Sequence, residues 1–494
     1  MRFELHPHQA LALTRLRASL LAGKKRPMLQ APTGAGKTLL AAAIVDGALE
    51  KGKRVLFTVP LLSLVDQTVE AFARQGIRAV GVMQGYHPQT DGTQPVQIAS
   101  LQTLRRRRIP GADLVIIDEA HRWFTFMEAW LATPEWQRVP FIGLSATPWG
   151  SGLGKHFDDL IVAATTAELI DNGFLAPFRV FAPSHPDLAG VRTVAGDYHE
   201  GQLSEAMSKP MLVADVVGTW LRLGDNRPTL CFAVDRAHAR RLAAEFKAAG
   251  VSSAYVDAMT PRDERERIKE RLRHGLVRVI VNVATMTTGV DLDARCIILA
   301  RPTKSQMLYV QIVGRGLRTA VGKADCLILD HSDTTLRLGF VTDIHHRRLD
   351  PGTRKAGIAG GEEKPKPLPK ECPSCSFLKP AGIHQCPSCG FAPERQSAIE
   401  ESAGDLVQIN GRRLKTGIAA HSRQQVYSML LWTARERGYK PGFASAKFKA
   451  RFGDWPHGLS AVPAEPDPPF LGWMRSEQIR WHKGLKKREA SHAG

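Results

Sequence analysis

Ala31-Pro-Thr-Gly-Ala-Gly-Lys37-Thr38 is the stretch of this sequence that decides the fold. It follows a short apolar segment, Met28 to Gln30, and it precedes the helical run from Leu39 to Val45. A phosphate-binding loop requires this setting between a strand and a helix, because the N-terminus of the helix points backbone N–H groups at the anion. The alternative is a chance glycine-rich turn, which would require neither the preceding strand nor the following helix.

The residues of this loop have separate tasks at a nucleotide. Gly34 and Gly36 let backbone N–H groups close on the phosphates, Lys37 brings a positive charge to the β and γ phosphates, and Thr38 offers a hydroxyl to Mg²⁺. Ala31 stands where the strict pattern has glycine. We expect the nucleotide to contact Thr33, Gly34, Ala35, Gly36, Lys37 and Thr38.

Short apolar runs typical of strands alternate with amphipathic stretches between residues 27 and 148, and the same rhythm returns between residues 229 and 330. This alternation predicts two α/β domains with parallel sheets. A chain of 494 residues with 43% hydrophobic composition is also too long for a single core. The expected parts are a first domain at 1–150, a connector at 151–210, a second domain at 211–349, a flexible linker at 350–370, a zinc ribbon at 371–392 and a basic module at 401–494.

Asp118-Glu-Ala-His121 follows the buried-strand run from Asp113 to Ile117. Ligands of α/β sheets bind at the carboxyl ends of the strands. Asp118 is therefore expected to hold Mg²⁺, and Glu119 to orient or deprotonate an attacking water. Taken alone, the tetrapeptide also fits a solvated loop.

The order of the motifs resembles that of superfamily 2 helicases from residue 1 to residue 335. Besides the phosphate-binding loop and Asp118 to His121, the sequence contains six further motifs in the order typical of this family. They are Gln9, Val59 to Gln67, Ala99 to Leu104, Ser145 to Thr147, Ala284 to Asp291 and Gln311 to Arg318. The resemblance implies two RecA-like domains that bind ATP between them and contact nucleic acid through the motifs at 59–67 and 99–104.

The resemblance also implies a role for individual residues. The chemistry is expected to involve Lys37, Asp118, Glu119, Gln311, Arg315 and Arg318, with the two arginines as fingers acting in cis. Adenine is expected at Gln9, since a glutamine amide can pair with adenine N6 and N7. Nucleotide contacts are also expected at Gly289 and Asp291, and coupling to nucleic acid at His121, Ser145 and Thr147. Surface salt bridging is the alternative role for Arg315 and Arg318.

The motif from Gln311 to Arg318 begins with glutamine, whereas RNA helicases of the DEAD-box type usually have histidine at this position. In this respect the motif is similar to that of XPB-like and UvsW-like DNA translocases, particularly phage and prophage members. The formal net charge of +19 would attract a polyanion. We therefore expect an ATP-dependent DNA helicase or translocase. The alternatives are an RNA helicase and, from another class, an ATP-switched nucleic-acid binding or assembly factor that does not unwind strands.

Two Cys-x-x-Cys pairs lie beyond these motifs: Cys372 with Cys375, and Cys386 with Cys389. Four thiolates on two facing turns can complete a tetrahedron around Zn²⁺ and leave no open position, so we expect structural zinc. A redox dithiol is the alternative.

Residues 401–494 contain 16 Lys plus Arg against 8 Asp plus Glu. Their aromatic residues Phe443, Phe448, Phe452 and Trp455 are expected to form a small helical core, while the charges remain available to DNA. This region is also expected to bind a replication or recombination protein. The chain has no apolar run of 18 residues, so we expect a cytoplasmic protein of a bacterium or phage-infected cell that binds no membrane.

Overall fold

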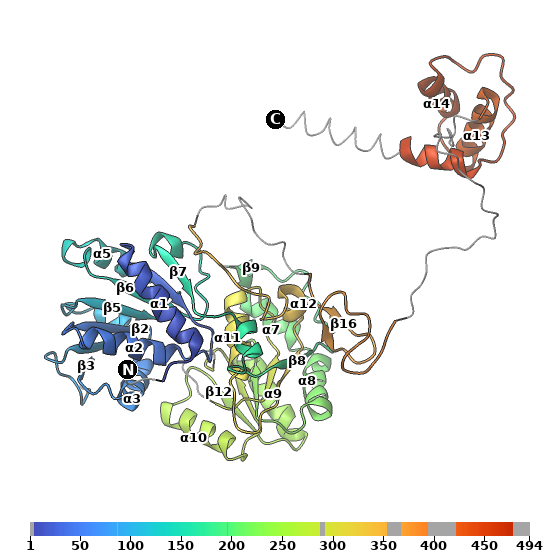
Figure 1. Ribbon diagram of the computed structural model, residues 1–494. Coiled ribbons are helices and arrows are strands. Elements are labelled where there is room, and N and C mark those ends of the chain that lie inside the picture. Colours follow the sequence, from blue (N-terminus) through green and yellow to red (C-terminus); the bar gives the residue numbers. More distant parts are fainter. Residues whose placement is uncertain are drawn as a thin grey trace. The chain divides into compact units, whose positions relative to one another are not determined.

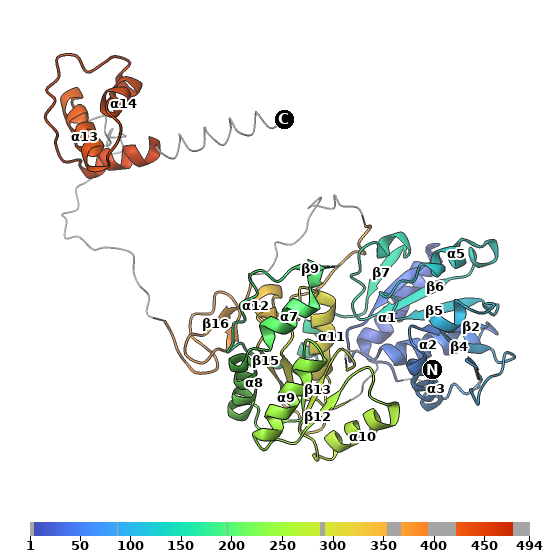
Figure 2. The same ribbon diagram turned by 180° about the vertical axis from the view of Figure 1, so that it is seen from behind.

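The computed structural model describes residues 4–85, 87–194, 196–286, 292–352, 367–393 and 421–477 (Figure 1). The chain divides into two compact units, residues 1–395 and residues 396–494. Figures 1 and 2 show from opposite sides that the first unit holds two sheets flanked by helices. Among the described residues, no helix combines the length and the apolar composition needed to cross a membrane.

The first sheet has seven strands in the order β3-β4-β2-β5-β6-β1-β7, all parallel. Helices cover both faces of this sheet, so successive residues of a central strand pack into the cores on opposite faces. Met28 and Leu56 enter one core, and their neighbours Leu29 and Phe57 enter the other. The strands are β1 Pro27–Gln30, β2 Val55–Val59, β3 Val80–Met83, β4 Val96–Ser100, β5 Leu114–Asp118, β6 Phe141–Ser145 and β7 Asp159–Val162.

Three longer helices and several short ones accompany this sheet. Leu13 of α1, Leu40 of α2 and Phe72 of α3 enter the core on one face, and Leu101 of α4 and Trp130 of α5 enter the core on the other. The helices are α1 Pro7–Leu21, α2 Lys37–Leu49, α3 Val65–Arg74, α4 Leu101–Leu104, α5 Phe126–Ala132 and α6 Thr166–Asp171, with 3-10 turns η1 Leu62–Leu64, η2 Pro134–Trp136 and η3 Leu153–Lys155.

The second sheet has six parallel strands in the order β12-β13-β11-β14-β15-β8. Its strands are β8 Phe178–Phe181, β11 Thr229–Phe232, β12 Ser253–Val256, β13 Val279–Asn282, β14 Cys296–Leu299 and β15 Cys326–Asp330. Its helices are α7 Glu200–Met207, α8 Pro210–Leu223, α9 Arg236–Ala248, α10 Arg262–Arg273, α11 Gln306–Gly316 and α12 Thr334–Leu338, and a short hairpin joins β9 Thr193–Val194 to β10 Asp197–Tyr198. The predicted α/β fold with two parallel sheets is thus confirmed.

The stretch 151–210, expected as a connector, also supplies an edge strand to each sheet. β7 pairs with β1 in the first sheet, and β8 pairs with β15 in the second. Each of these strands has only four residues, so neither has a sustained hydrophobic period in the sequence. The chain therefore passes from one sheet to the other between Val162 and Phe178.

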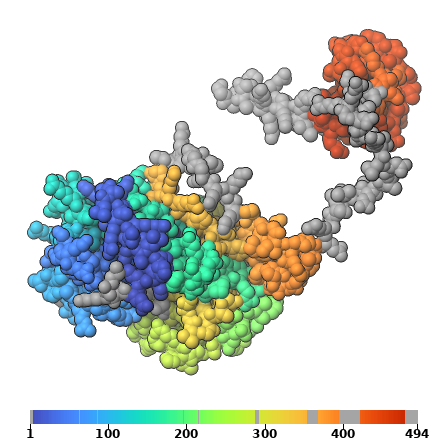
Figure 3. All heavy atoms as spheres, in the orientation of Figure 1, coloured from blue at the N-terminus to red at the C-terminus, as the bar shows by residue number. Residues whose placement is uncertain are grey.

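The segment 367–393 packs against the second domain. It forms the small hairpin β16 Lys370–Glu371 and β17 Leu378–Lys379, and its Phe377 makes an isolated bridge with Phe181 of β8. The two phenylalanine rings meet edge to face at 5.4 Å, and Phe377 joins the core on one face of the second sheet. In Figure 3 this segment, in orange, is in continuous contact with the rest of the first compact unit, to which it belongs.

The second compact unit contains α13 Arg423–Glu436 and α14 Phe443–Phe452. Phe448 and Phe470 are fully buried between these helices, and Phe443 and Phe452 pack partly buried around them. The expected aromatic core is therefore present. Trp455 departs from it, because it is 45% exposed with Lys449 Nζ 4.5 Å from its ring centre.

Candidate active site between the two sheets

A cavity of about 610 Å³ lies between the carboxyl ends of the strands of the first sheet and α11 of the second domain. The phosphate-binding loop enters it from the end of β1, and Asp118 enters it at the end of β5. The predicted site residues that line it are Thr33, Gly34, Gly36, Lys37, Thr38, Asp118, Glu119, Arg315 and Arg318. Two domains thus contribute side chains to one cavity.

Backbone conformation sets the shape of the loop. Gly34 and Gly36 have φ angles of +91° and +78°, in the left-handed region that favours glycine. Gly36 caps the N-terminus of α2, so the first backbone N–H groups of this helix lack intrahelical partners and can face an anion. A side chain at Gly36 would also collide with the amide of Gln9, which packs behind the loop.

Lys37 lies between two carboxylates. Its Nζ is 3.0 Å from Asp118 Oδ1 and 2.5 Å from Glu119 Oε1. Burial alone would lower the pKa of Lys37, but the charges of Asp118 and Glu119 outweigh it and raise the pKa to about 12. The ammonium group therefore remains charged and offsets part of the negative charge of the two carboxylates.

Glu119 has the chemistry of a carboxylate base. Burial alone would raise its pKa, but the charge of Lys37 and the hydrogen bond that its ammonium group donates lower the pKa below the usual range, so the side chain is ionised at neutral pH. Its φ of +50° is uncommon for a residue other than glycine. Strained backbone of this kind is concentrated at functional sites.

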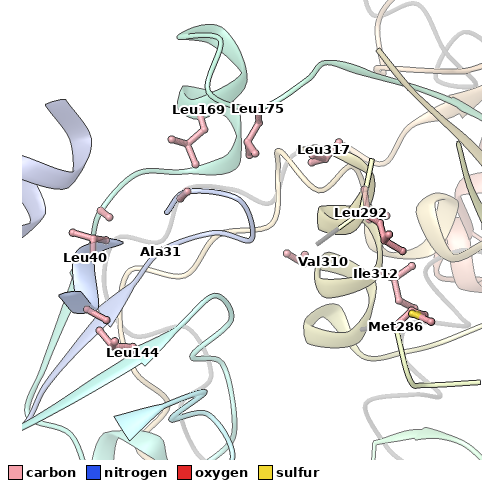
Figure 4. Packing of buried hydrophobic residues seen from close by; sticks show 14 of the residues in the cluster. Ala31, Leu40, Leu144, Leu169, Leu175, Met286, Leu292, Val310, Ile312 and Leu317 are labelled. Carbon is pink, nitrogen blue, oxygen red and sulfur yellow. The ribbon is translucent and has the colours of Figure 1, made fainter. Parts of the chain in front are cut away.

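Arg315 and Arg318 reach the cavity from the C-terminal end of α11. Arg315 is 7% exposed, which is unusual for a charged side chain. Gly314 allows the close approach of this helix to the loop, because a Cβ there would lie 2.8 Å from Thr33 Cβ. Figure 4 shows that Val310 and Ile312 of the same helix point to different sides, with Ile312 directed toward Met286 and Leu292 of the second domain.

Two family comparisons match the two sheets separately. Residues 2–149 match the family described as "Type III restriction enzyme, res subunit", and residues 210–320 match the "Helicase conserved C-terminal domain". The chain belongs to the superfamily 2 helicases. Its two α/β domains are therefore the ATP-hydrolysing pair of such an enzyme.

Individual relatives of this helicase cover different shares of it. It is 28% identical over 412 residues to the "51.5 kDa protein" of a Lactococcus phage, which covers 80% of this chain and 85% of the phage protein. It is 32% identical over 252 residues to the "Putative ATP-dependent helicase IRC3" of Saccharomyces cerevisiae, but the match spans only 48% of this chain and 37% of the yeast protein. A fragment of a putative HsdR subunit of a type I restriction enzyme from Vibrio vulnificus has the same fold, with 23% identity and a TM-score of 0.52 over 68% of this chain and 66% of that one.

A chain of hydrogen bonds joins the two domains of the helicase behind the cavity. Gln311 Nε2 of α11 donates to Thr147 Oγ1 at 2.9 Å and lies 3.4 Å from His121 Nε2. Burial lowers the pKa of His121 to about 4, so the ring is neutral at neutral pH. Because the Gln311 amide nitrogen can only donate, His121 Nε2 accepts and its Nδ1 carries the proton toward Ser145 Oγ, 2.9 Å away. The predicted coupling residues thus form one interdomain network.

Gln9 lies behind the loop of the helicase and is 1% exposed. Its Oε1 accepts from the His6 backbone N–H at 3.0 Å, and its Nε2 donates to the Ala35 carbonyl at 3.0 Å. Gln9 and Ala35 therefore contact each other and do not line the cavity wall. Gly289 and Asp291 lie outside the described residues.

Some residues that line the cavity had no predicted nucleotide role. Gln67 belongs to the motif at 59–67 that is expected to contact nucleic acid, and no role is predicted for Arg74 of α3 or for Phe174 after α6. Phe174 also contacts the rings of His6 and His8, with centroid distances of 4.6 and 4.8 Å. The place of Phe174 in the cavity depends on the path of the chain between the two sheets.

The four cysteines of the helicase converge, with all four Sγ atoms within 4.8 Å of one another. Cys372 Sγ is 3.7 Å from Cys389 Sγ, and Cys375 Sγ is 3.8 Å from Cys386 Sγ. Four sulfurs at a Zn–S distance of about 2.3 Å in a tetrahedron are about 3.8 Å apart. The thiolates present therefore fit a Zn²⁺ ion.

Proposed function

We propose that this chain is an ATP-driven motor that moves on DNA, similar to XPB-like and UvsW-like translocases. The observation that carries the proposal is the shared cavity: Arg315 and Arg318 of one domain face Lys37, Asp118 and Glu119 of the other. Hydrolysis in such a cavity depends on how the two domains are placed, and this dependence is what a motor needs. The phage and yeast relatives, one of them described as a helicase, support this proposal.

ATP binding would change the partners of Lys37. In this structure its ammonium group is held by Asp118 and Glu119. The ammonium group would then bind the β and γ phosphates in place of the carboxylates. The Glu119 carboxylate would be left to orient and deprotonate water. Thr38 and Asp118 would hold Mg²⁺, which neutralises phosphate charge when bound. Each step thus uses a group already present at the cavity.

Arg315 and Arg318 would stabilise the charge that develops on the γ-phosphate. Gln311 lies on the same helix and contacts Thr147 and His121 of the first domain. A shift of α11 on phosphate release would therefore break or remake these contacts. The motifs at 59–67 and 99–104 belong to the first domain. The same shift would therefore move these nucleic-acid contacts relative to the second domain.

DNA is the proposed track, and steady-state ATP hydrolysis distinguishes it from RNA. We expect duplex or single-stranded DNA to raise the rate at least tenfold above the basal rate, and RNA of the same sequence to raise it much less. The measurement uses the full chain with the three polymers at equal phosphate concentration. Equal stimulation by RNA would support the RNA helicase, and no stimulation by any polymer would contradict a motor.

We also propose that the four cysteines bind one structural zinc ion that supports the second domain. Besides the contact of Phe377 with Phe181, the Ala182 N–H donates to the Ser376 carbonyl at 2.9 Å, and His185 Nε2 lies 2.9 Å from Glu371 Oε2. Metal loss would unfold the hairpin and expose the apolar edge at β8.

A chain ending at residue 395 should therefore keep one zinc ion by elemental analysis, together with the thermal midpoint of the first compact unit. A chain ending at 366 should melt several degrees lower, because it loses the partly buried Phe377 and the buried Leu378, and removing a buried leucine costs about 2–5 kcal/mol. The Cys386→Ser variant of the full chain should lose the zinc and melt lower as well. Equal midpoints for the chains ending at 366 and 395 would show that the ribbon does not support the second domain.

A further inference from the structure

Arg105-Arg-Arg-Arg108 is a run of four exposed arginines that the ATP site does not use. The sequence contains no other run of four consecutive cationic residues. Within the described part of the chain, no acidic side chain pairs with any of these guanidinium groups. A concentration of positive charge without internal compensation is typical of a surface that binds a polyanion.

The fold holds this run in a defined place. β4 ends at Ser100, whose Oγ accepts from the Thr103 backbone N–H at 3.1 Å and so starts α4. Leu101 and Leu104 of that short helix are buried, and Ile109, after the run, packs against the same core. The segment is thus anchored on both sides, and the arginines follow the short helix that starts at the edge of the sheet that also carries the phosphate-binding loop and Asp118.

The spacing favours duplex over single-stranded nucleic acid. The Cα atoms of Arg105 and Arg108 are at most about 11 Å apart. Over that length a DNA duplex presents about six phosphate charges, whereas one strand presents about three. Four guanidinium groups would outnumber the phosphates of a single strand but would all find partners on a duplex, where each can bind phosphate oxygens bidentately.

We propose that Arg105 to Arg108 form a phosphate-binding surface for duplex DNA, which lies beside the motif at 99–104 and holds the double-stranded part of the substrate. The inference rests on the proposed DNA motor and adds the form of the DNA and the residues that hold it. It requires no change in the ATP site. Removing these charges should therefore weaken duplex binding and leave DNA-free ATP hydrolysis unchanged.

The test compares two triple variants of the full chain that lose the same charge. One is Arg105→Gln with Arg106→Gln and Arg107→Gln. The control is Lys24→Gln with Lys51→Gln and Arg78→Gln, three exposed cations that precede β1, β2 and β3 at the opposite edge of the same sheet. Fluorescence anisotropy with a labelled duplex and with one of its strands gives Kd between 50 and 300 mM NaCl.

We expect the arginine variant to bind duplex about tenfold or more weakly and to lose about 2 to 3 from the log–log salt slope, since each phosphate contact contributes about 0.9. The control and the charge-preserving variant Arg105→Lys with Arg106→Lys and Arg107→Lys should keep the wild-type slope. Equal slopes for the arginine variant and the control, or an equal loss on the single strand, would overturn the inference. Failure of the proposed function can be distinguished from failure of this inference. If the proposed function were wrong, ATP hydrolysis by the wild-type chain would not respond to any DNA.

Discussion

Replacing Glu119 with Gln should reduce DNA-stimulated ATP hydrolysis by roughly 10²–10⁴-fold, the usual contribution of a general base. The amide keeps the size of the side chain and its ability to contact Lys37, but it cannot accept a proton from water. ATP binding should therefore persist or tighten, because Lys37 would have one fewer carboxylate partner. The measurements are the steady-state rate with duplex DNA and equilibrium binding of a fluorescent ATP analogue.

Glu50→Gln is the matched control, since Glu50 is an exposed residue of the same domain after α2. It should hydrolyse ATP at the wild-type rate. If Glu119→Gln also did so with DNA present, the base would have to be another group, and the proposed role of Glu119 would be wrong.

Replacing Arg315 with Ala should reduce hydrolysis by about 10³-fold or more, the effect of losing an arginine finger. ATP affinity should change little, because the charge that Arg315 would stabilise develops mainly in the transition state. The drop should therefore appear in kcat and not in KM. Arg271→Ala, which removes an exposed arginine of α10 in the same domain, should leave both constants unchanged.

Arg315 is nearly buried, so loss of folding must be separated from loss of catalysis. The thermal midpoint provides this separation, and Arg315→Lys provides a variant that keeps the charge without the planar geometry. A folded Arg315→Ala protein with wild-type kcat would place the guanidinium in a structural role only.

The parts of the site that could be predicted from the sequence are those encoded in short contiguous motifs. The loop at 31–38 and Asp118 to His121 follow strands of a parallel sheet, and the carboxyl ends of such strands meet at one edge. Topology alone therefore brings these motifs together. The position of Arg315 and Arg318 in the same cavity required the family resemblance, because nothing local relates α11 to a loop nearly 280 residues earlier.

Features that depend on long-range packing could not be predicted. β8 pairs with β15 almost 150 residues away, and four residues are too few to show a hydrophobic period. The Cys-x-x-Cys spacing predicts a metal site but contains no signal that Phe377 would insert beside Phe181. Phe174 was missed for the same reason, since its role follows from the crossing between the sheets.

The most direct test of the central claim, that this chain moves on DNA at the expense of ATP, is displacement of a third strand from a DNA triplex. We expect the full chain to displace the labelled strand with ATP and Mg²⁺, and not with a nonhydrolysable analogue. The Glu119→Gln variant should bind the same DNA and displace nothing. Displacement that is equally fast without hydrolysis, or none from a wild-type chain that hydrolyses ATP on that DNA, would contradict the account.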